Sequence, residues 1–329
     1  MTTGVVLRRF RNGDPPELCR LWNAAGLGPA AMRRLTPDEL DFFVLSQLHF
    51  DPSGLIVAEA EGQLVGFVHA CPPIESAGWE PRGSQGVIAL VLVHPEFRRR
   101  GIGRCLVAAA EEYLCRRGCH EVLAGESPPT TPFYLGLYGS AACAGFLSAE
   151  TAANPFFRAC GYGEYRRWQV WTRSLERANE PFDPRVAGNR RRYRLELSEL
   201  PPTASARWIS REGRWEAAWA GLIAENESAA VASCTVWPMR TISTNRGEHV
   251  AGITDLYVPP AHRRKAFAKT LLLEVLRHLR TDHFSEAELV APTEDTATKC
   301  LVQLAGFAPT DVGIVYYRRL TEIVTPGVE

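Results

Sequence analysis

The stretch Val87–Arg117, VIALVLVHPEFRRRGIGRCLVAAAEEYLCRR, decides the fold. Its first seven residues are apolar and rich in β-branched side chains without alternation, which is typical of a strand buried on both faces. After His94-Pro95, two glycines, Gly101 and Gly103, precede a segment with apolar residues at helical spacing. Glycine lets backbone N–H groups turn inward, and the first-turn amides of a helix lack partners inside the helix. The stretch therefore predicts a strand, a glycine loop and a helix N-terminus that can bind a phosphate.

Two common phosphate-loop motifs do not fit this stretch. There is no G-x-x-x-x-G-K-[ST], and G-x-G-x-x-G would need a glycine where Arg99 stands. The segment from Arg98 resembles the acetyl-CoA pyrophosphate loop, [QR]-x-x-G-x-[GA], of the GNAT superfamily of acyl-CoA-dependent N-acyltransferases. The preceding VHPEF is similar to that family's usual Val, x, Pro, acidic, aromatic preface. The alternative is an ordinary β-turn-α corner that carries solvated arginines.

Composition sets limits on size and partners. The chain has 329 residues, of which 46% are apolar and 22% charged, enough for about two soluble domains. Its formal net charge is zero, so the charge balance favours neither nucleic acid nor an anionic membrane. Nine cysteines without a CxxC pair, and no apolar signal segment, predict reduced thiols in a cytoplasm and no metal site. No apolar run approaches the roughly 20 residues of a membrane span.

The elements around the central stretch follow from caps, turns and periodicity. Asp14 reads as a helix cap, Thr36 and Glu39 form a capping box, and Glu61-Gly62 reads as a hairpin turn. The expected order is strand 5–10, a helix through 22, a helix over 40–48, strands 55–59 and 63–70, the central strand and helix, strand 120–124, helix 154–160 and strand 169–172. This order matches a GNAT domain.

Residues 125–149, GESPPTTPFYLGLYGSAACAGFLSA, form an unusually long connection. Loops of this length in a compact domain are either functional or disordered, and the aromatic content argues against disorder. We interpret the segment as a packed lid over the acceptor site. A structural flap is the remaining interpretation.

The second half of the chain repeats the first. LVLVHPEFRRRGIGRCLV and DLYVPPAHRRKAFAKTLL align without a gap at a shift of 165, and FFRACGY aligns with LVQLAGF at a shift of 145. We therefore predict an α/β (α+β) protein of two tandem GNAT folds, each a mixed, mostly antiparallel, splayed sheet flanked by helices. The predicted parts are an N-terminal domain, 1–175, a linker, 176–192, and a C-terminal domain, 193–329. The architecture resembles that of mycothiol synthase.

The second domain reads as a degenerate copy. Ala266 and Ala268 replace both loop glycines, and the helical region between its first strand and its hairpin is about half as long. A Cβ at position 266 enters where backbone must approach phosphate. We expect one acetyl-CoA for each chain, bound by the first domain.

The resemblance implies which residues bind acetyl-CoA. The central strand splays from its neighbour in this family, so that pantetheine pairs with the free edge of Val91, Leu92 and Val93. The loop supplies backbone amides and positive charge for the phosphates. Its residues are Arg98, Arg99, Arg100, Gly101, Ile102, Gly103 and Arg104.

The family's usual proton-transfer groups are missing. The acid common on the central strand is replaced by Ala89 and Leu90, and the tyrosine four residues before Gly161 is Phe157. In the second domain the position of the acid holds Asp255. The remaining candidates in the first domain are Glu126 as base and Tyr134 or Tyr138 as acid. Each can equally be a solvated carboxylate or a packing residue.

The resulting prediction is an acetyl-CoA-dependent N-acetyltransferase in the acyltransferase class. It acts on an amine of a small molecule or protein, as a cytoplasmic monomer or homodimer without nucleic-acid or membrane partners. Two alternatives are a catalytically weak CoA-binding regulatory protein and a two-domain scaffold.

Overall fold

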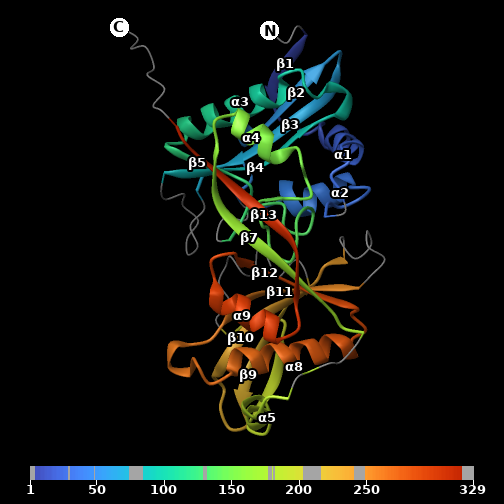
Figure 1. Cartoon of the computed structure of the whole chain (residues 1–329). Coiled ribbons are helices and arrows are strands. Elements are labelled where there is room, and N and C mark those ends of the chain that lie inside the picture. Colours follow the sequence, from blue (N-terminus) through green and yellow to red (C-terminus); the bar gives the residue numbers. More distant parts are fainter. Residues whose placement is uncertain are drawn as a thin grey trace. The chain divides into compact units, whose positions relative to one another are not determined.

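The computed structural model describes residues 4–28, 30–47, 49–73, 84–128, 132–176, 180, 182–202, 216–240 and 249–320. The chain forms two compact units (Figure 1). Unit 1 comprises residues 1–139, 143–167 and 313–329, and unit 2 comprises residues 140–142 and 168–312. The predicted fold class is confirmed, because each unit is a mixed, mostly antiparallel sheet flanked by helices.

The sheet of unit 1 is antiparallel except for one parallel pair. Its strands in spatial order are β1 (Val5–Arg9), β2 (Leu55–Ala60), β3 (Gln63–Cys71), β4 (Gln85–Val93), β5 (Glu121–Ala124) and the last strand of the chain, β13 (Ala308–Arg319), which also pairs with β6 (Phe146–Leu147). The parallel pair is β4 and β5. Both residues of the β2–β3 turn, Glu61 and Gly62, have positive φ, 53° and 75°, as a two-residue hairpin turn requires.

The helices of unit 1 are α1 (Pro15–Ala24), α2 (Pro37–Leu40) with a π-helical turn η1 (Asp41–Leu45), α3 (Ile102–Arg116) and α4 (Ala153–Ala159), with 3-10 turns η2 (Pro52–Gly54) and η3 (Pro95–Phe97). The predicted capping box is confirmed, since Glu39 N–H donates to Thr36 Oγ1 and Thr36 N–H donates to Glu39 Oε2. The predicted helix start is confirmed, because Asp14 is the N-cap residue of α1, but the expected side-chain cap is not formed. Its carboxylate instead pairs with the Arg8 guanidinium at 2.8 Å, so it makes no side-chain bond to the helix N-terminus.

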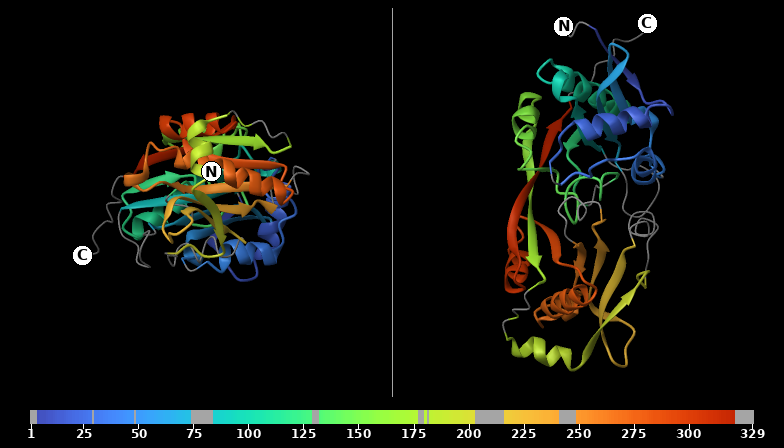
Figure 2. Two further views of the ribbon diagram at one scale, coloured as in Figure 1. Left: turned by 90° about the horizontal axis from the view of Figure 1, so that it is seen from below. Right: turned by 90° about the vertical axis from the view of Figure 1, so that its right-hand side faces the viewer.

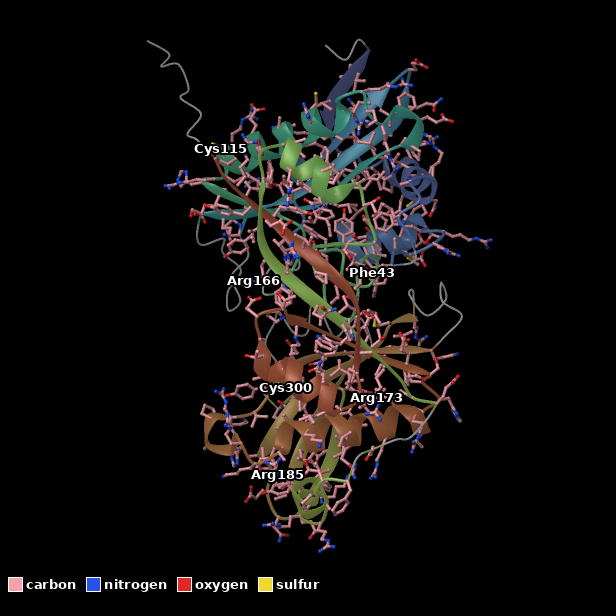
Figure 3. All side chains as sticks on the ribbon, in the orientation of Figure 1. Phe43, Cys115, Arg166, Arg173, Arg185 and Cys300 are labelled. Carbon is pink, nitrogen blue, oxygen red and sulfur yellow. The ribbon has the colours of Figure 1, made fainter. Side chains whose placement is uncertain are left out.

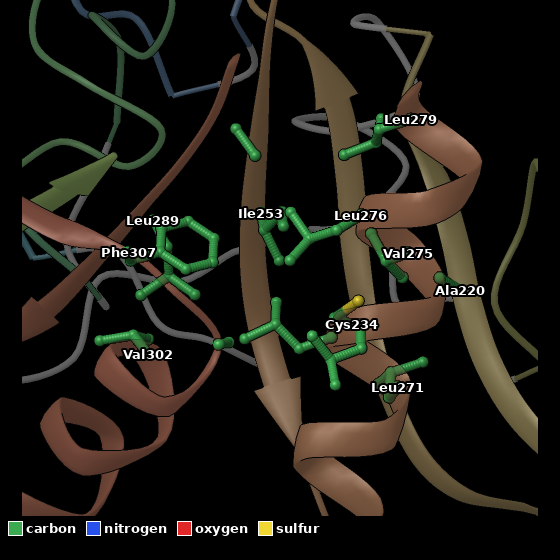
Figure 4. Packing of buried hydrophobic residues seen from close by; sticks show 14 of the residues in the cluster. Ala220, Cys234, Ile253, Leu271, Val275, Leu276, Leu279, Leu289, Val302 and Phe307 are labelled. Carbon is green, nitrogen blue, oxygen red and sulfur yellow. The ribbon is translucent and has the colours of Figure 1, made fainter. Parts of the chain in front are cut away.

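The sheet of unit 2 contains β7 (Gly163–Ser174), β12 (Glu286–Pro292), β11 (Val250–Tyr257), β10 (Ala230–Pro238), β9 (Ala218–Ala224) and β8 (Tyr193–Ser198). Its helices are α5 (Pro184–Arg190), α8 (Phe267–Thr281) and α9 (Thr296–Leu304), with the 3-10 turn η5 (Pro260–His262). Leu271 and Leu276 of α8 pack against Cys234 and Ile253 of the sheet (Figure 4).

The last strand of each sequence half completes the sheet of the other unit. Residues 168–174 of β7 pair antiparallel with β12, whereas β13 pairs with β5, placing Tyr316 opposite Ala124. Figure 2 shows β7 and β13 as long neighbouring strands. The compact units therefore depart from the predicted division into 1–175 and 193–329, because sheet hydrogen bonds join segments that are distant in sequence.

Two arginines fasten the exchanged strands. Arg318 of β13 donates to the Cys160 carbonyl at the end of α4, with 2.9 Å between the atoms, and Arg173 of β7, labelled in Figure 3, donates to the Ala305 carbonyl at the end of α9. A cation suits the negative end of a helix. Arg318 lies 145 residues after Arg173, and Ala305 lies 145 residues after Cys160. The two exchanged strands are therefore held by equivalent contacts.

The predicted linker, 176–192, contains an ordered helix. The Asp183 side chain accepts from Arg185 N–H and caps α5, and Val186 is part of the core of unit 2. Charge and proline obscured this short helix, which needs tertiary packing for its stability. Residues 177–179 and 181 of that linker lie outside the described residues.

Candidate active site

The central strand β4 leaves its parallel neighbour halfway along its length. Residues 85–88 pair with β5, Gly125 N–H donates to the Ile88 carbonyl at 2.9 Å, and the described register with β5 ends there. A bulge at Ala89 in the pairing with β3 accompanies the divergence. The strand edge over Val91, Leu92 and Val93 therefore lies beyond the fork, where an extended ligand can pair with backbone.

The loop after β4 has a conformation that gathers amides at the start of α3. Arg99 and Gly101 have φ values of 63° and 82°, and α3 begins at Ile102. Left-handed residues in such a turn can direct successive N–H groups inward and form an anion-binding concavity. The dipole of α3 adds positive potential at the same place.

The four loop arginines have different surroundings. Arg98 donates to the Val93 carbonyl at 3.0 Å and to the Ala25 carbonyl at 2.7 Å, so it fixes the loop. The Arg100 guanidinium lies 4.9 Å from the centroid of the Phe97 ring. All four arginines, Arg99 and Arg104 among them, are exposed. Positive charge is therefore available along the outer side of the loop.

Gly103 has a packing reason as well. A Cβ at Gly103 would lie 2.9 Å from Cε2 of Phe156, so glycine lets α4 approach the first turn of α3 closely. This reason differs from the predicted freedom of the backbone.

Unit 2 repeats the loop conformation. Arg264 and Ala266 have φ values of 65° and 62°, and Arg263 donates to the Val258 carbonyl at 3.1 Å. The β11–β12 register ends at Ile253, and Asp255, with a φ of 52°, lies in the bulge that follows. The left-handed conformation costs an alanine about 1 kcal/mol relative to glycine. The loop shape is thus kept although both glycines are absent.

The described residues of the predicted lid, 125–128 and 132–149, belong largely to the protein core. Ten apolar or aromatic side chains of this segment are buried: Phe133, Tyr134, Leu135, Leu137, Tyr138, Ala141, Cys143, Ala144, Phe146 and Leu147. Residues 129–131 lie outside the described part of the chain. The segment is therefore packed, as predicted, and it also supplies β6 to the sheet.

Glu126 holds this segment in place. Its carboxylate accepts from the N–H groups of Phe133 and Tyr134, each at 2.9 Å, and from Cys143 Sγ at 3.4 Å. The side chain is buried, and burial raises its pKa to about 7 against the opposing effect of these bonds. It follows Gly125, so it lies directly at the β4–β5 fork. This geometry favours an anchoring role for Glu126.

Tyr134 meets a histidine that the sequence did not single out. The Tyr134 hydroxyl lies 3.1 Å from His69 Nδ1 of β3, the His69 ring stacks on Phe133, and Tyr134 stacks on Trp22 of α1. Burial lowers the pKa of His69 to about 3, so its imidazole is neutral at pH 7. A polar residue within the apolar strand QLVGFVHAC was the signal available.

Tyr138 lies apart from that pair. Its hydroxyl accepts from Leu147 N–H at 3.3 Å, and its backbone forms a bridge with Ala31. Of the three predicted catalytic residues, the structure brings Glu126 and Tyr134 together through a backbone bond, while Tyr138 contacts the strand β6.

Tyr316 lies beside Phe157, the residue at the position where the family usually has a tyrosine. Phe157 of α4 is buried and stacks on Tyr316 of β13, with ring centroids 5.1 Å apart. Only the strand exchange brings Tyr316 to this place, so no local sequence pattern indicated it.

Because the pKa of Glu126 is raised in the folded protein, we expect the unfolding free energy of the protein to depend on pH. The unfolded chain releases this proton near pH 4.5 and the folded chain near pH 7, so the stabilising contribution is present below pH 4.5 and is lost as the pH rises to about 7. Between pH 5 and pH 8 the wild type should lose about 2 kcal/mol of unfolding free energy more than Glu126→Gln does. Urea unfolding at both pH values measures the difference. The control is Glu121→Gln on β5, and an equal pH dependence of wild type and Glu126→Gln would contradict the prediction.

Within the described residues, no group of three or more His, Cys, Asp or Glu side chains is arranged to hold a metal ion. No described helix has the length and apolar character needed to cross a bilayer. All nine cysteines are free thiols.

Comparisons with known proteins agree with this geometry. A family model described as the Acetyltransferase (GNAT) family matches residues 20–137 and again residues 189–307. An acetyltransferase of Sodalis glossinidius (strain morsitans) is 31% identical over 116 residues, 35% of this chain and 71% of that protein. An acetyltransferase of Pectobacterium atrosepticum is 32% identical over 116 residues, 35% and 72% of the two chains.

Two solved structures share the fold over nearly the whole chain. A tandem GNAT protein from the clavulanic acid biosynthesis pathway has a TM-score of 0.62 at 18% identity, covering 96% of this chain and 98% of that one. A GCN5-related N-acetyltransferase from Sphaerobacter thermophilus has a TM-score of 0.59 at 17% identity, covering 96% and 95%. The tandem arrangement predicted from the internal repeat is therefore confirmed.

Proposed function

The chain belongs to the GNAT acetyltransferase family, and from this premise we propose that unit 1 transfers an acetyl group from acetyl-CoA to an amine. One observation carries the proposal. The β4–β5 fork, the left-handed loop residues Arg99 and Gly101, and the start of α3 lie in succession along one stretch of unit 1. Together they offer a strand edge for an extended amide-containing chain and converging amides for phosphates.

The proposed roles follow from this order. Backbone groups of Val91, Leu92 and Val93 pair with the pantetheine amides, and the loop amides from Arg99 to Arg104 bind the pyrophosphate. Exposed Arg99 and Arg104 add charge-assisted bonds to phosphate oxygens. Arg98 acts indirectly, since its bonds to two carbonyls fix the loop. The thioester then lies near the fork, where a backbone N–H of β4 can stabilise the developing oxyanion.

Proton transfer is proposed to use the buried polar groups beside the fork. Tyr134 is the first candidate for protonating the leaving thiolate, because its phenol is neutral at pH 7 and its hydroxyl bonds to a neutral imidazole. Tyr138 is the second candidate. Glu126, with a pKa of about 7, is proposed to anchor the lid and to accept the amine's proton through water.

The acceptor is proposed to be an amine of a small molecule or of a protein, bounded by the aromatic residues of the lid. The second candidate function is a CoA-binding regulatory protein. It is favoured by the hydrogen bonds that already engage Glu126, Tyr134 and Tyr138. Calorimetry with acetyl-CoA, followed by CoA release with a panel of amines, separates the two. Binding without CoA release for any amine would overturn the enzymatic proposal.

We further propose a cytoplasmic monomer or homodimer.

A binding stoichiometry near one acetyl-CoA for each chain is expected. Ala266 keeps the left-handed conformation, but its methyl group lies where backbone must approach phosphate. Calorimetric titration gives the number of sites directly. Ala266→Gly is the informative variant, because it removes that methyl and relieves the strain, and it should raise affinity at the second loop. Two equal sites in the wild type would refute the degenerate-copy prediction and return Asp255 to the catalytic candidates.

A further inference from the structure

The lid changes unit at its tip. Residues 132–139 and 143–149 belong to unit 1, whereas residues 140–142 between them belong to unit 2. Ser140 Oγ donates to the Ala142 carbonyl at 2.8 Å and closes a short turn. The exposed fractions of Ser140 and Ala141 are 2% and 0%. The tip is therefore built into the packing of unit 2.

Two side chains of unit 2 satisfy both backbone groups of Ala141. Its N–H donates to Glu288 Oε1 at 2.7 Å, and its carbonyl accepts from Trp237 Nε1 at 3.1 Å. Glu288 is completely buried, so this lid amide lies on a buried carboxyl group. If the tip detached, a buried carboxyl group would lose a hydrogen-bond donor, which raises the free energy of the folded protein. The contact is therefore strongly favoured over a detached tip.

A glycine makes room for this contact. Trp237, Gly252 and Glu288 lie opposite one another on the adjacent strands β10, β11 and β12. A Cβ at Gly252 would lie 2.6 Å from Trp237 Nε1 and 3.2 Å from the Ala141 Cβ. We call these three residues the lid clasp. Their neighbours Ala251 and Leu289 face the core with α8, so the lid clasp is on the opposite face of the sheet.

The two halves of the chain differ in the length of the connection between their first two strands in sequence. In unit 1, the segment between β1 and β2 runs from residue 10 to residue 54 and carries α1 and α2. In unit 2, the corresponding segment between β8 and β9 runs only from residue 199 to residue 217.

We propose that the lid clasp is a positioning device for the acceptor site, an inference that rests on the function proposed above. Ala141 is seven residues from Tyr134 and three from Tyr138. Over so few residues, fixing one end of a segment limits the positions that the other end can adopt. Holding residues 140–142 therefore restricts where both tyrosines lie. Unit 2, although a degenerate copy, contributes to turnover by ordering the lid of unit 1, and Trp237 and Glu288 are positioning residues.

Hydrogen exchange and kinetics of the full chain test the proposal together. Trp237→Phe removes the indole N–H, and Glu288→Ala removes the carboxyl group. Each should speed amide exchange over residues 132–147 about tenfold and lower kcat/KM for the acceptor about fivefold, with the acetyl-CoA affinity unchanged. The control is Trp219→Phe on β9, a tryptophan of unit 2 that is also buried and is not part of the lid clasp. It should change neither quantity.

A milder variant guards against loss of folding. Gly252→Ala adds only a methyl group, which must displace Trp237 or Ala141, and it should reproduce the exchange and kinetic changes. Unchanged lid exchange in Trp237→Phe and Gly252→Ala would overturn the proposal, and so would faster exchange with unchanged acceptor kinetics. The exchange measurement needs no substrate. Failure of the proposed function, seen as absent acetyl-CoA binding in the wild type, is therefore distinguishable from failure of the lid clasp.

Discussion

Replacing Gly101 by tryptophan should weaken acetyl-CoA binding at least about 100-fold, or roughly 2.7 kcal/mol. Gly101 has a φ of 82° at the position that starts α3. A bulky residue in that conformation costs about 1 to 2 kcal/mol, and its side chain would occupy the space proposed for the phosphates. Each charge-assisted bond lost there removes about 1.5 to 3 kcal/mol more. Calorimetric titration of the variant and the wild type measures the change.

The control for Gly101→Trp is at the other end of the same helix. Gly118 has a φ of 81°, and a Cβ there would meet nothing within 4 Å. Gly118→Trp therefore imposes the same backbone strain on α3 without reaching the loop after β4. It should lower stability similarly and leave acetyl-CoA affinity intact. Equal affinity of Gly101→Trp and the wild type would sink the assignment of the loop as the phosphate site.

The arginines of the loop require a more selective interpretation than the sequence allowed. Spacing made Arg98, Arg99 and Arg100 equally available, but Arg98 bonds to two carbonyls and Arg100 lies on the Phe97 ring. A loss of affinity in an Arg98 variant would therefore report on the shape of the loop. Arg99 and Arg104 are the better probes of direct phosphate contact.

Local features were predictable where a few adjacent residues determine the outcome. The glycine loop, the Thr36–Glu39 capping box and the Glu61-Gly62 turn each depend on backbone conformation within four residues. The internal repeat then doubled the information, because one loop predicted the other. The matching φ values of Arg99 and Arg264 show that the repeat extends to backbone geometry.

Features set by distant contacts were not predictable. The exchange of β7 and β13 depends on which strand edges meet, and both strands carry similar patterns, so the sequence did not distinguish the pairings. Tyr316 reaches Phe157 only through that exchange. Glu126 looked like a base because it follows a strand at the cleft. Its role as the acceptor of two lid amides depends on the folded position of Phe133 and Tyr134.

Deletion of the lid is not a suitable test of its role in catalysis. Replacing residues 125–149 with a short turn would remove ten buried apolar or aromatic side chains and the strand β6. Loss of activity would then report on loss of the core. Single-atom changes within the lid are the appropriate probe of catalysis.

Tyr134→Phe should lower kcat for acetyl transfer about 100-fold with the acetyl-CoA affinity unchanged, because loss of a positioned proton donor typically costs that much or more. The variant removes only the hydroxyl that bonds to His69 Nδ1, and the ring retains its stacking on Trp22. Single-turnover kinetics with an accepted amine measure the chemical step. Tyr113→Phe is the matched control, since Tyr113 is a buried residue of α3 whose hydroxyl donates to Asp51 and is not part of the lid.

The result for Tyr134 also decides between the two tyrosines. If the residual rate falls further in the Tyr134→Phe, Tyr138→Phe double variant, Tyr138 has a supporting role in proton transfer. Its hydroxyl would then have to break its hydrogen bond with Leu147 N–H to act. Full activity of the double variant would remove both proposed donors. The phenol of Tyr316, which stacks on the residue in the family tyrosine's position, would then be the group to test, and Tyr316→Phe should show the loss that Tyr134→Phe did not.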